Sequence, residues 1–364
     1  MIEYFTLGPG KKLNEIVMAG SHDAGVTSGK SNVKTQSVDI GGQARAGVRV
    51  FDIRITASGS GKLRAYHGQG YKTTVQKPNS TEAIESKKIL VGAYGLGLVD
   101  MLSQAKTFVR DHGNEFLILK FDKCQNWLDI ADACNDILGG DGIEDRIYRV
   151  RGDLNNATLD DVKGKVIVCF TEGGTKALGA AYMFDHDHIR LITNLYGSNR
   201  GYDSSFFDGI QYWGKGGTSV APKIKFWTDS NAGKIKQNID KQKKIMLAAV
   251  ERGAGADPEV MGMMYWTTTG ITGNIKDRNR LMWRGRNVNK LHELWHSGFQ
   301  ESIRSRMPDH LDMDEYASAV IVKAFMPNIV MIDFADEDKC KKIFAMNKCP
   351  TTVLTTLSFG ADEI

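Results

Sequence analysis

The chain has few cysteines, little net charge and no long apolar runs. Its five cysteines show no Cys-x-x-Cys spacing, which argues against a zinc site or a redox motif. Its 47 basic residues nearly balance its 43 acidic residues, so nucleic acid is not expected as a partner. No stretch approaches the roughly 20 apolar residues of a membrane-spanning helix, so we expect no transmembrane segment.

Residues 1–5 lack a basic region followed by an apolar core, so the sequence predicts no secretion signal in this chain. A content of 41% hydrophobic and 25% charged residues is typical of a folded globular protein. Neither a repeat nor a long linker interrupts the sequence, so we expect one catalytic domain over residues 1–364. That length is sufficient for one large α/β barrel.

Short β-branched and aromatic runs alternate with amphipathic stretches, which is typical of parallel strands joined by crossover helices. The predicted strands are 15–19, 48–55, 63–67, 116–121, 166–170, 223–227, 261–266 and 328–333. The predicted helices are 98–110, 232–250, 288–299 and 313–326. Eight strands predict an α/β fold of the (β/α)8 TIM-barrel type. The barrel should be irregular, because the glycine-rich link 57–62 predicts a hairpin, and the polar region 197–218 should form rim loops.

Titratable and cationic residues follow the first three predicted strands. His22 and Asp23 lie in the phrase GSHDAG, Arg54 ends the second strand, and His67 ends the third. Two imidazoles can act as base and acid near neutral pH, and a guanidinium can bind phosphoryl oxygens. Because barrel enzymes bind ligands where their strands end, these residues predict cleavage of a phosphodiester.

The phrases around these residues resemble those of bacterial phosphatidylinositol-specific phospholipases C, the X-domain family. The matching phrases are GSHDAG (20–25), GVRVFDIR (47–54), HG (67–68), EFLILK (115–120), GKVIV (164–168) and, more loosely, MYWTT (264–268) and NIVMIDF (328–334). The resemblance implies an irregular TIM barrel that contacts membranes and converts phosphatidylinositol to diacylglycerol and inositol 1,2-cyclic phosphate. Slow hydrolysis of the cyclic phosphate would follow. The family also suggests secretion.

The resemblance implies a role for each catalytic candidate. His22 would take the proton from the inositol 2-hydroxyl. Asp333, or Asp336 in its place, would orient the His22 ring and stabilise its cation. His67 would protonate the diacylglycerol oxygen, supported by Asp23.

The same resemblance bears on metal use. Asp52 and Arg54 form an Asp-x-Arg phrase as in metal-independent members, in which the guanidinium replaces calcium. Asp122, however, lies where those members have lysine and calcium-using relatives have glutamate. We therefore expect no required cofactor, with calcium held by Asp23, Asp52 and Asp122 as the alternative.

Four residues are candidate ligands of the headgroup. Asp122 and Thr171 lie where metal-independent members have a lysine and an arginine. Lys225 or Trp227, on the sixth predicted strand, would compensate, the indole by stacking on the inositol ring. The tract DHDH (185–188) is expected to be a solvated loop rather than a metal cluster, because adjacent side chains point apart.

The sequence thus predicts a phosphatidylinositol-specific phospholipase C that uses two histidines. Two alternatives remain: a calcium-dependent phosphodiesterase of the same barrel acting on another glycerophosphodiester, and a catalytically silent module that binds a headgroup. His22, Arg54 and His67 disfavour the silent module, because binding alone requires neither an acid nor a base.

Overall fold

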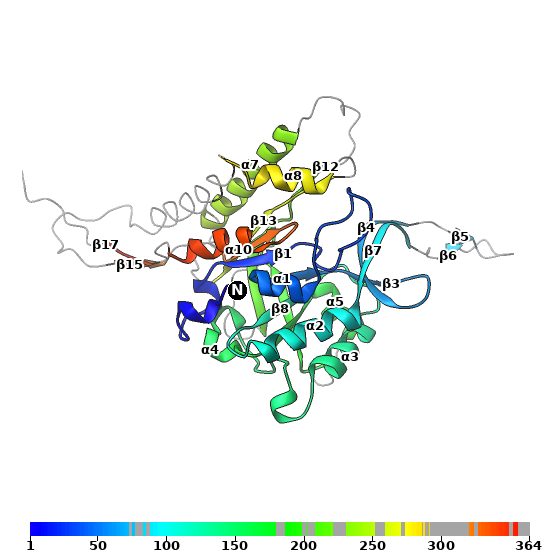
Figure 1. The fold of residues 1–364 in the computed structure, drawn as a ribbon, viewed down its shortest axis with the longest axis horizontal. Helices are drawn as coiled ribbons and strands as arrows, with labels where there is room; N and C mark the ends of the chain where they lie inside the picture. Colours follow the sequence, from blue (N-terminus) through cyan, green and yellow to red (C-terminus); the bar gives the residue numbers. More distant parts are fainter. Residues whose placement is uncertain are drawn as a thin grey trace, which may run out of the picture.

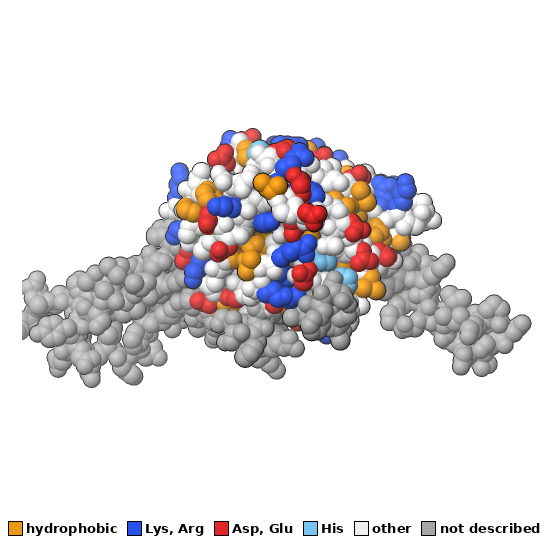
Figure 2. Space-filling model, turned by 90° about the horizontal axis from the view of Figure 1, so that it is seen from below, with side chains coloured by type: hydrophobic (Ala, Val, Ile, Leu, Met, Phe, Trp, Pro, Cys, Tyr) orange, Lys and Arg blue, Asp and Glu red, His pale blue; other side chains and the backbone are white. Residues whose placement is uncertain are grey.

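The structure is a computed structural model of the 364-residue chain. It describes residues 1–72, 75–76, 83–84, 88–179, 186–198, 202, 208–220, 231–251, 259–270, 274–285, 287, 291, 320–323, 327–348 and 352–355. Among these residues, no helix combines the length and apolar character needed to cross a bilayer. On the face shown in Figure 2, acidic and basic side chains interleave with small apolar groups, so no broad patch of one charge covers it.

Eight parallel strands close into a barrel, as the sequence predicts (Figure 1). In order around the barrel they are β1 (Met18–Ser21), β2 (Val48–Ile53), β8 (Leu117–Phe121), β9 (Val166–Thr171), β10 (Ile189–Asn194), β11 (Gly209–Gly214), β13 (Met261–Trp266) and β16 (Ile329–Ile332). β16 pairs with β1 and completes the closure. The strands are rich in buried valine, isoleucine, leucine and methionine, as parallel strands covered on both faces require.

Helices cover the outside of the barrel. They are α1 (Ile40–Ala46), α2 (Leu98–Asp111), α3 (Trp127–Leu138), α4 (Leu159–Val162), α5 (Glu172–Leu178), α7 (Asn231–Glu251), α8 (Ile275–Met282) and α10 (Glu337–Phe344). In α2, buried side chains recur three and four residues apart, as in Leu98, Met101 and Ala105, so one stripe faces inward. The helices predicted at 98–110 and 232–250 are confirmed as α2 and α7. Of the helix predicted at 288–299, the structure describes only residue 291. Of the helix predicted at 313–326, it describes residues 320–323, which form a strand, so the prediction is wrong there.

Two of the eight predicted barrel strands are not found in the barrel. Residues 63–67 belong to a separate antiparallel sheet, and 223–227 lie outside the described residues. Their places are taken by β10 and by β11, which falls inside the region predicted as rim loops. β10 escaped prediction because it carries Arg190, which is buried and donates hydrogen bonds to the carbonyl oxygens of Val150 and Ile189.

An antiparallel sheet lies beside the barrel, formed by β3 (Ile55–Ala57), β4 (Leu63–Lys72) and β7 (Lys88–Gly97) (Figure 1). The hairpin predicted at 57–62 is confirmed as the link between β3 and β4. Gly92 of β7 lies opposite Gly68, and a Cβ there would come within 1.8 Å of the carbonyl oxygen of His67. Only glycine therefore allows β7 to pair this closely behind His67.

Shorter elements complete the described fold. The remaining strands are β5 (Val75–Gln76), β6 (Ala83–Ile84), β12 (Thr218–Val220), β14 (Thr268–Gly270), β15 (Val320–Lys323) and β17 (Thr352–Thr355). The 3-10 turns are Tyr4–Leu7, Leu13–Glu15, Gly142–Glu144, Leu154–Asn156 and Ala345–Lys348.

Candidate active site

His22 follows the last residue of β1 and faces Asp333, which follows β16. The two strands pair in register at Ser21 and Ile332, so the next residue of each strand lies beside the other. His22 Nδ1 is 3.0 Å from Asp333 Oδ1, and the ring meets that of Tyr265 edge to face at 5.9 Å between centroids. Asp336 instead caps α10, accepting a hydrogen bond from the backbone of Lys339. The structure therefore brings Asp333 to His22, and not Asp336.

The surroundings of His22 favour its protonated form. Burial lowers the pKa of His22, but the carboxylates of Asp23 and Asp333 outweigh burial and raise the pKa above its usual value. Burial also raises the pKa of Asp333, against the opposing effect of His22. With Nδ1 donating to Asp333, Nε2 is the nitrogen that is free to accept a proton, and the arrangement suits a general base.

Asp23 lies between the two histidines. Its backbone has φ 44°, a left-handed conformation that is uncommon outside glycine and often found at functional sites. One carboxylate oxygen lies 2.5 Å from His67 Nδ1 and 3.6 Å from His22 Nε2. The other lies 2.9 Å from Arg54 Nε, an ion pair without hydrogen-bond alignment. Burial would raise the pKa of Asp23, but the cations of Arg54, His22 and His67 hold the pKa far below its usual range.

Asp52 and Lys120 form a second buried pair beneath Arg54. The two residues are direct partners in the ladder between β2 and β8, and Lys120 Nζ lies 2.6 Å from Asp52 Oδ1. Arg54 Nη2 lies 3.6 Å from the other oxygen of Asp52. Burial would raise the pKa of Asp52, but Lys120 and Arg54 lower it below its usual value. Lys120 also reaches Asp122 Oδ2 at 3.5 Å.

Positive and negative groups therefore alternate along one continuous row. Their order is His67, Asp23, Arg54, Asp52, Lys120 and Asp122. Each buried carboxylate lies between two groups that are cationic or can become so, which is the condition for keeping it ionised inside a protein. Every member of this row except Lys120 was expected from the sequence. No local signal identifies Lys120, because its ladder partner Asp52 lies on another strand.

The carboxylates in this row are already matched by cations from the protein. His22, Asp23 and Asp52 each offer a ligand atom within 4.8 Å of the others. Calcium takes about six to eight oxygen ligands, and few remain because Arg54 and Lys120 contact the same carboxylates. Calcium at these carboxylates would therefore compete with Arg54 and Lys120 for the same oxygen atoms.

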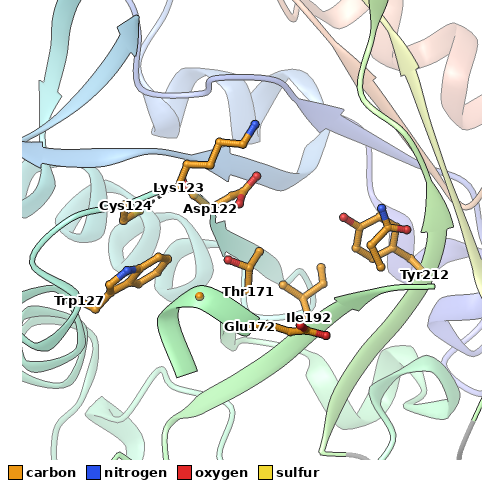
Figure 3. A pocket seen from close by; sticks show the side chains of 10 residues that line it. Asp122, Lys123, Cys124, Trp127, Thr171, Glu172, Ile192 and Tyr212 are labelled. Carbon is orange, nitrogen blue, oxygen red and sulfur yellow. Dashed lines mark hydrogen bonds between the residues drawn. The ribbon is translucent and has the colours of Figure 1, made fainter. Parts of the chain in front are cut away.

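A cavity of about 520 Å³ opens beside Asp122, over the ends of β8 to β11 (Figure 3). Its lining comprises Asp122, Lys123, Cys124, Trp127, Thr171, Glu172, Gly173, Ile192, Asn194 and Tyr212. The structure thus brings Asp122 and Thr171 together, as expected of headgroup ligands, whereas Lys225 and Trp227 lie outside the described residues. Asn194 and Tyr212 were missed because β10 and β11 were not predicted.

The DHDH tract differs in part from the expected solvated loop. Asp185 lies outside the described residues. His188 is buried, with Nε2 3.0 Å from the carbonyl oxygen of Ala131, and Asp187 pairs with Arg149 at 2.9 Å. The described residues 186–188 thus form a turn with Asp187 exposed, as expected of a loop, and only His188 departs from the prediction by being buried.

Comparisons with known proteins relate the chain to one group of bacterial enzymes. No family model matches it. Two curated proteins of Staphylococcus aureus, strains Newman and NCTC 8325, are each named 1-phosphatidylinositol phosphodiesterase and are 28% identical over 197 residues. The match covers 52% of this chain and 56% and 53% of those proteins, so the chain spans about half the length of the curated relatives it matches. These relatives bear out the resemblance noted in the sequence.

Solved structures show the same fold. A phosphatidylinositol-specific phospholipase C of S. aureus has a TM-score of 0.52 at 16% identity, with 93% of this chain and 95% of that chain covered. The corresponding enzyme of Listeria monocytogenes has a TM-score of 0.50 at 13% identity, again with 93% and 95% covered. The irregular TIM barrel is therefore the fold of bacterial phosphatidylinositol-specific phospholipases C.

Proposed function

We propose that this protein is a phosphatidylinositol-specific phospholipase C, which cleaves its lipid by intramolecular attack. The observation that carries the proposal is the position of two imidazoles on either side of Asp23, with the Arg54 guanidinium on the same carboxylate. This arrangement provides a base, an acid and an anion clamp at one end of the barrel. The names of the S. aureus relatives support the same activity.

In the first step, His22 Nε2 takes the proton of the inositol 2-hydroxyl, and the oxygen attacks phosphorus. Arg54 stabilises the phosphoryl oxygens as negative charge grows on them. His67 gives a proton to the diacylglycerol oxygen while the bond from phosphorus to that oxygen breaks. The products are diacylglycerol and inositol 1,2-cyclic phosphate. The phosphodiester keeps its single negative charge, because one proton leaves the 2-hydroxyl and another reaches the departing oxygen.

In the second, slower step, water opens the cyclic phosphate. His67, now unprotonated, takes a proton from the water, and protonated His22 returns a proton to the 2-oxygen. Each histidine thereby regains its starting protonation state, as a complete catalytic cycle requires. Asp23 contacts both rings and can stabilise whichever ring is cationic at each stage.

The cavity beside Asp122 is proposed to hold the inositol ring. Asp122, Glu172 and Asn194 present oxygen atoms that can accept hydrogen bonds from ring hydroxyls. Burial raises the pKa of the Tyr212 phenol to about 12, so this group stays neutral and can donate a hydrogen bond. We also propose that no metal ion is required, because Arg54 and Lys120 provide positive charge beside Asp23 and Asp52.

Phosphorus NMR of the reaction with phosphatidylinositol vesicles tests this proposal. We expect a signal of inositol 1,2-cyclic phosphate to appear first and to decline slowly as inositol 1-phosphate forms. The time course should be the same with a calcium chelator. Loss of turnover with the chelator, restored by calcium, would favour the calcium-dependent alternative. Binding of vesicles without any product would favour the silent headgroup-binding module.

Replacing Asp333 by asparagine is expected to move the acid limb of the pH profile of kcat/KM to lower pH. A general base acts only when deprotonated, so kcat/KM rises with pH through the pKa of His22, which Asp333 raises. Without that carboxylate the limb should move down by about one pH unit. The plateau should fall about 10²-fold or more, because the ring loses its orientation.

Asp336→Asn is the matched control for this change. Asp336 caps α10, where asparagine serves equally well, so the profile should stay as in the wild type. An unchanged acid limb in Asp333→Asn would contradict the pairing of Asp333 with a general base at His22.

A further inference from the structure

Lys120 is a buried cation that takes part in no proton transfer of the proposed reaction. Its side chain is only 1% exposed, and it projects from near the C-terminal end of β8 into the row of charges. A lysine taken out of water at this depth is costly unless anions surround it. Burial lowers the pKa of Lys120, but the negative charges of Asp52 and Asp122 outweigh burial and raise the pKa above its usual value, so the side chain stays an ammonium ion.

Asp52 depends on this ammonium group. Lys120 donates to Oδ1 of Asp52 at 2.6 Å, while the buried Oδ2 accepts no hydrogen bond from any described residue. The other positive groups that act on Asp52 are Arg54, at 3.6 Å, and the more distant His22. Removing Lys120 would leave Asp52 as a poorly compensated buried anion beside the guanidinium that is proposed to bind phosphate.

Asp122 connects Lys120 to the cavity. Asp122 is 26% exposed, lines the cavity, and lies 3.5 Å from the ammonium group. Figure 3 shows its carboxylate above Thr171, on the wall shared with Lys123. The ammonium group thus lies between one carboxylate on the catalytic side and one on the headgroup side.

We propose that Lys120 is a positioning residue that provides, as a permanent part of the protein, the positive charge that a divalent cation could otherwise provide between Asp52 and Asp122. The role rests on the proposed function, because the groups held in place are Arg54 and the cavity wall. It accounts for two carboxylates converging at the barrel mouth around a cation of the protein itself. The proposed role also predicts that removal of the ammonium group creates a calcium site between Asp52 and Asp122.

Terbium luminescence and kinetics on Lys120→Met test the role. Methionine keeps the length of the side chain and removes its charge. We expect Lys120→Met to bind Tb³⁺ about tenfold or more tightly than the wild type, with emission sensitised by Trp127 of the cavity wall and abolished by excess calcium. We expect kcat on phosphatidylinositol vesicles to fall about 10²-fold without calcium and to recover in part with it.

Two variants serve as controls. Lys120→Arg keeps the charge and should not gain affinity for Tb³⁺. Lys106→Met removes a half-buried lysine whose ammonium donates to the carbonyl oxygen of Gly139 on the outer helices, so both readouts should match the wild type. Equal Tb³⁺ affinity in Lys120→Met and the wild type would overturn the proposal, as would an unchanged kcat.

Folding provides a further measurement if Lys120→Met is unstable. Calcium bound between the two carboxylates should raise the midpoint of its urea unfolding and leave that of the wild type unchanged, because a ligand that binds only the folded state stabilises that state. No stabilisation by calcium would overturn the proposal. The Tb³⁺ and urea measurements need no substrate, so their outcome is separate from whether the wild type cleaves phosphatidylinositol.

Discussion

The His22→Ala variant should cleave phosphatidylinositol about 10³- to 10⁴-fold more slowly than the wild type, because it lacks the proposed general base. Asp333 would then remain buried without its imidazole partner, while Arg54 and His67 would keep their contacts with Asp23. The loss should therefore appear in kcat, with little change in KM. Initial rates on mixed micelles of phosphatidylinositol and detergent provide the measurement.

His186→Ala is the matched control for this variant. His186 lies in the turn before β10, and its ring is 5.8 Å from that of His188, far from the proposed chemistry. The variant should keep wild-type rates. Unchanged turnover in His22→Ala would exclude the proposed mechanism as a whole, because no other described imidazole contacts Asp333.

The His67→Ala variant should show a loss that depends on the leaving group. His67 is proposed to protonate the departing diacylglycerol oxygen, an alkoxide that leaves poorly without a proton. Cleavage of the lipid should therefore fall about 10³-fold. In an inositol phosphodiester of p-nitrophenol, the leaving group departs as the stable p-nitrophenolate anion and needs no proton, so cleavage of this substrate should fall much less. Parallel assays of both substrates with wild type and variant give the ratio.

His22→Ala serves as the comparison in the same assays. A missing base slows attack on phosphorus whichever group departs, so both substrates should be affected alike. If His67→Ala lost equal activity on the lipid and on the aryl ester, the general-acid role of His67 would be wrong. The two ratios together assign base and acid to separate histidines.

The fold class could be predicted because eight parallel strands leave a strong pattern of buried runs. The strands that escaped prediction carry polar residues inside the barrel wall. Arg190 in β10 satisfies its guanidinium on backbone carbonyls, and Gln211 in β11 is buried as well. Hydrophobic periodicity does not reveal buried polar residues of this kind, because the hydrogen-bond partners that compensate their burial come from elsewhere in the chain.

For the candidate site, most of the charged residues could be predicted, but fewer of the contacts between them. The phrase around His22 and the Asp-x-Arg phrase identified the charged groups, and the ends of parallel strands predicted that they would meet. Lys120 could not be recognised, because a lysine within an apolar strand has meaning only beside its ladder partner Asp52. Likewise, nothing local indicates that Arg49 and Glu115, 66 residues apart, form a buried ion pair at 2.6 Å.

The two proposed catalytic histidines belong to different sheets. His22 follows a strand that is hydrogen-bonded on both sides within the closed barrel, whereas His67 lies on β4, outside that barrel and backed by the glycine-lined pairing with β7. Segments with different packing open with different free energies, and an antiparallel sheet at the periphery can open while a closed barrel persists. Opening of the antiparallel sheet alone would separate His67 from Asp23, so activity would be lost while the barrel and His22 stay folded.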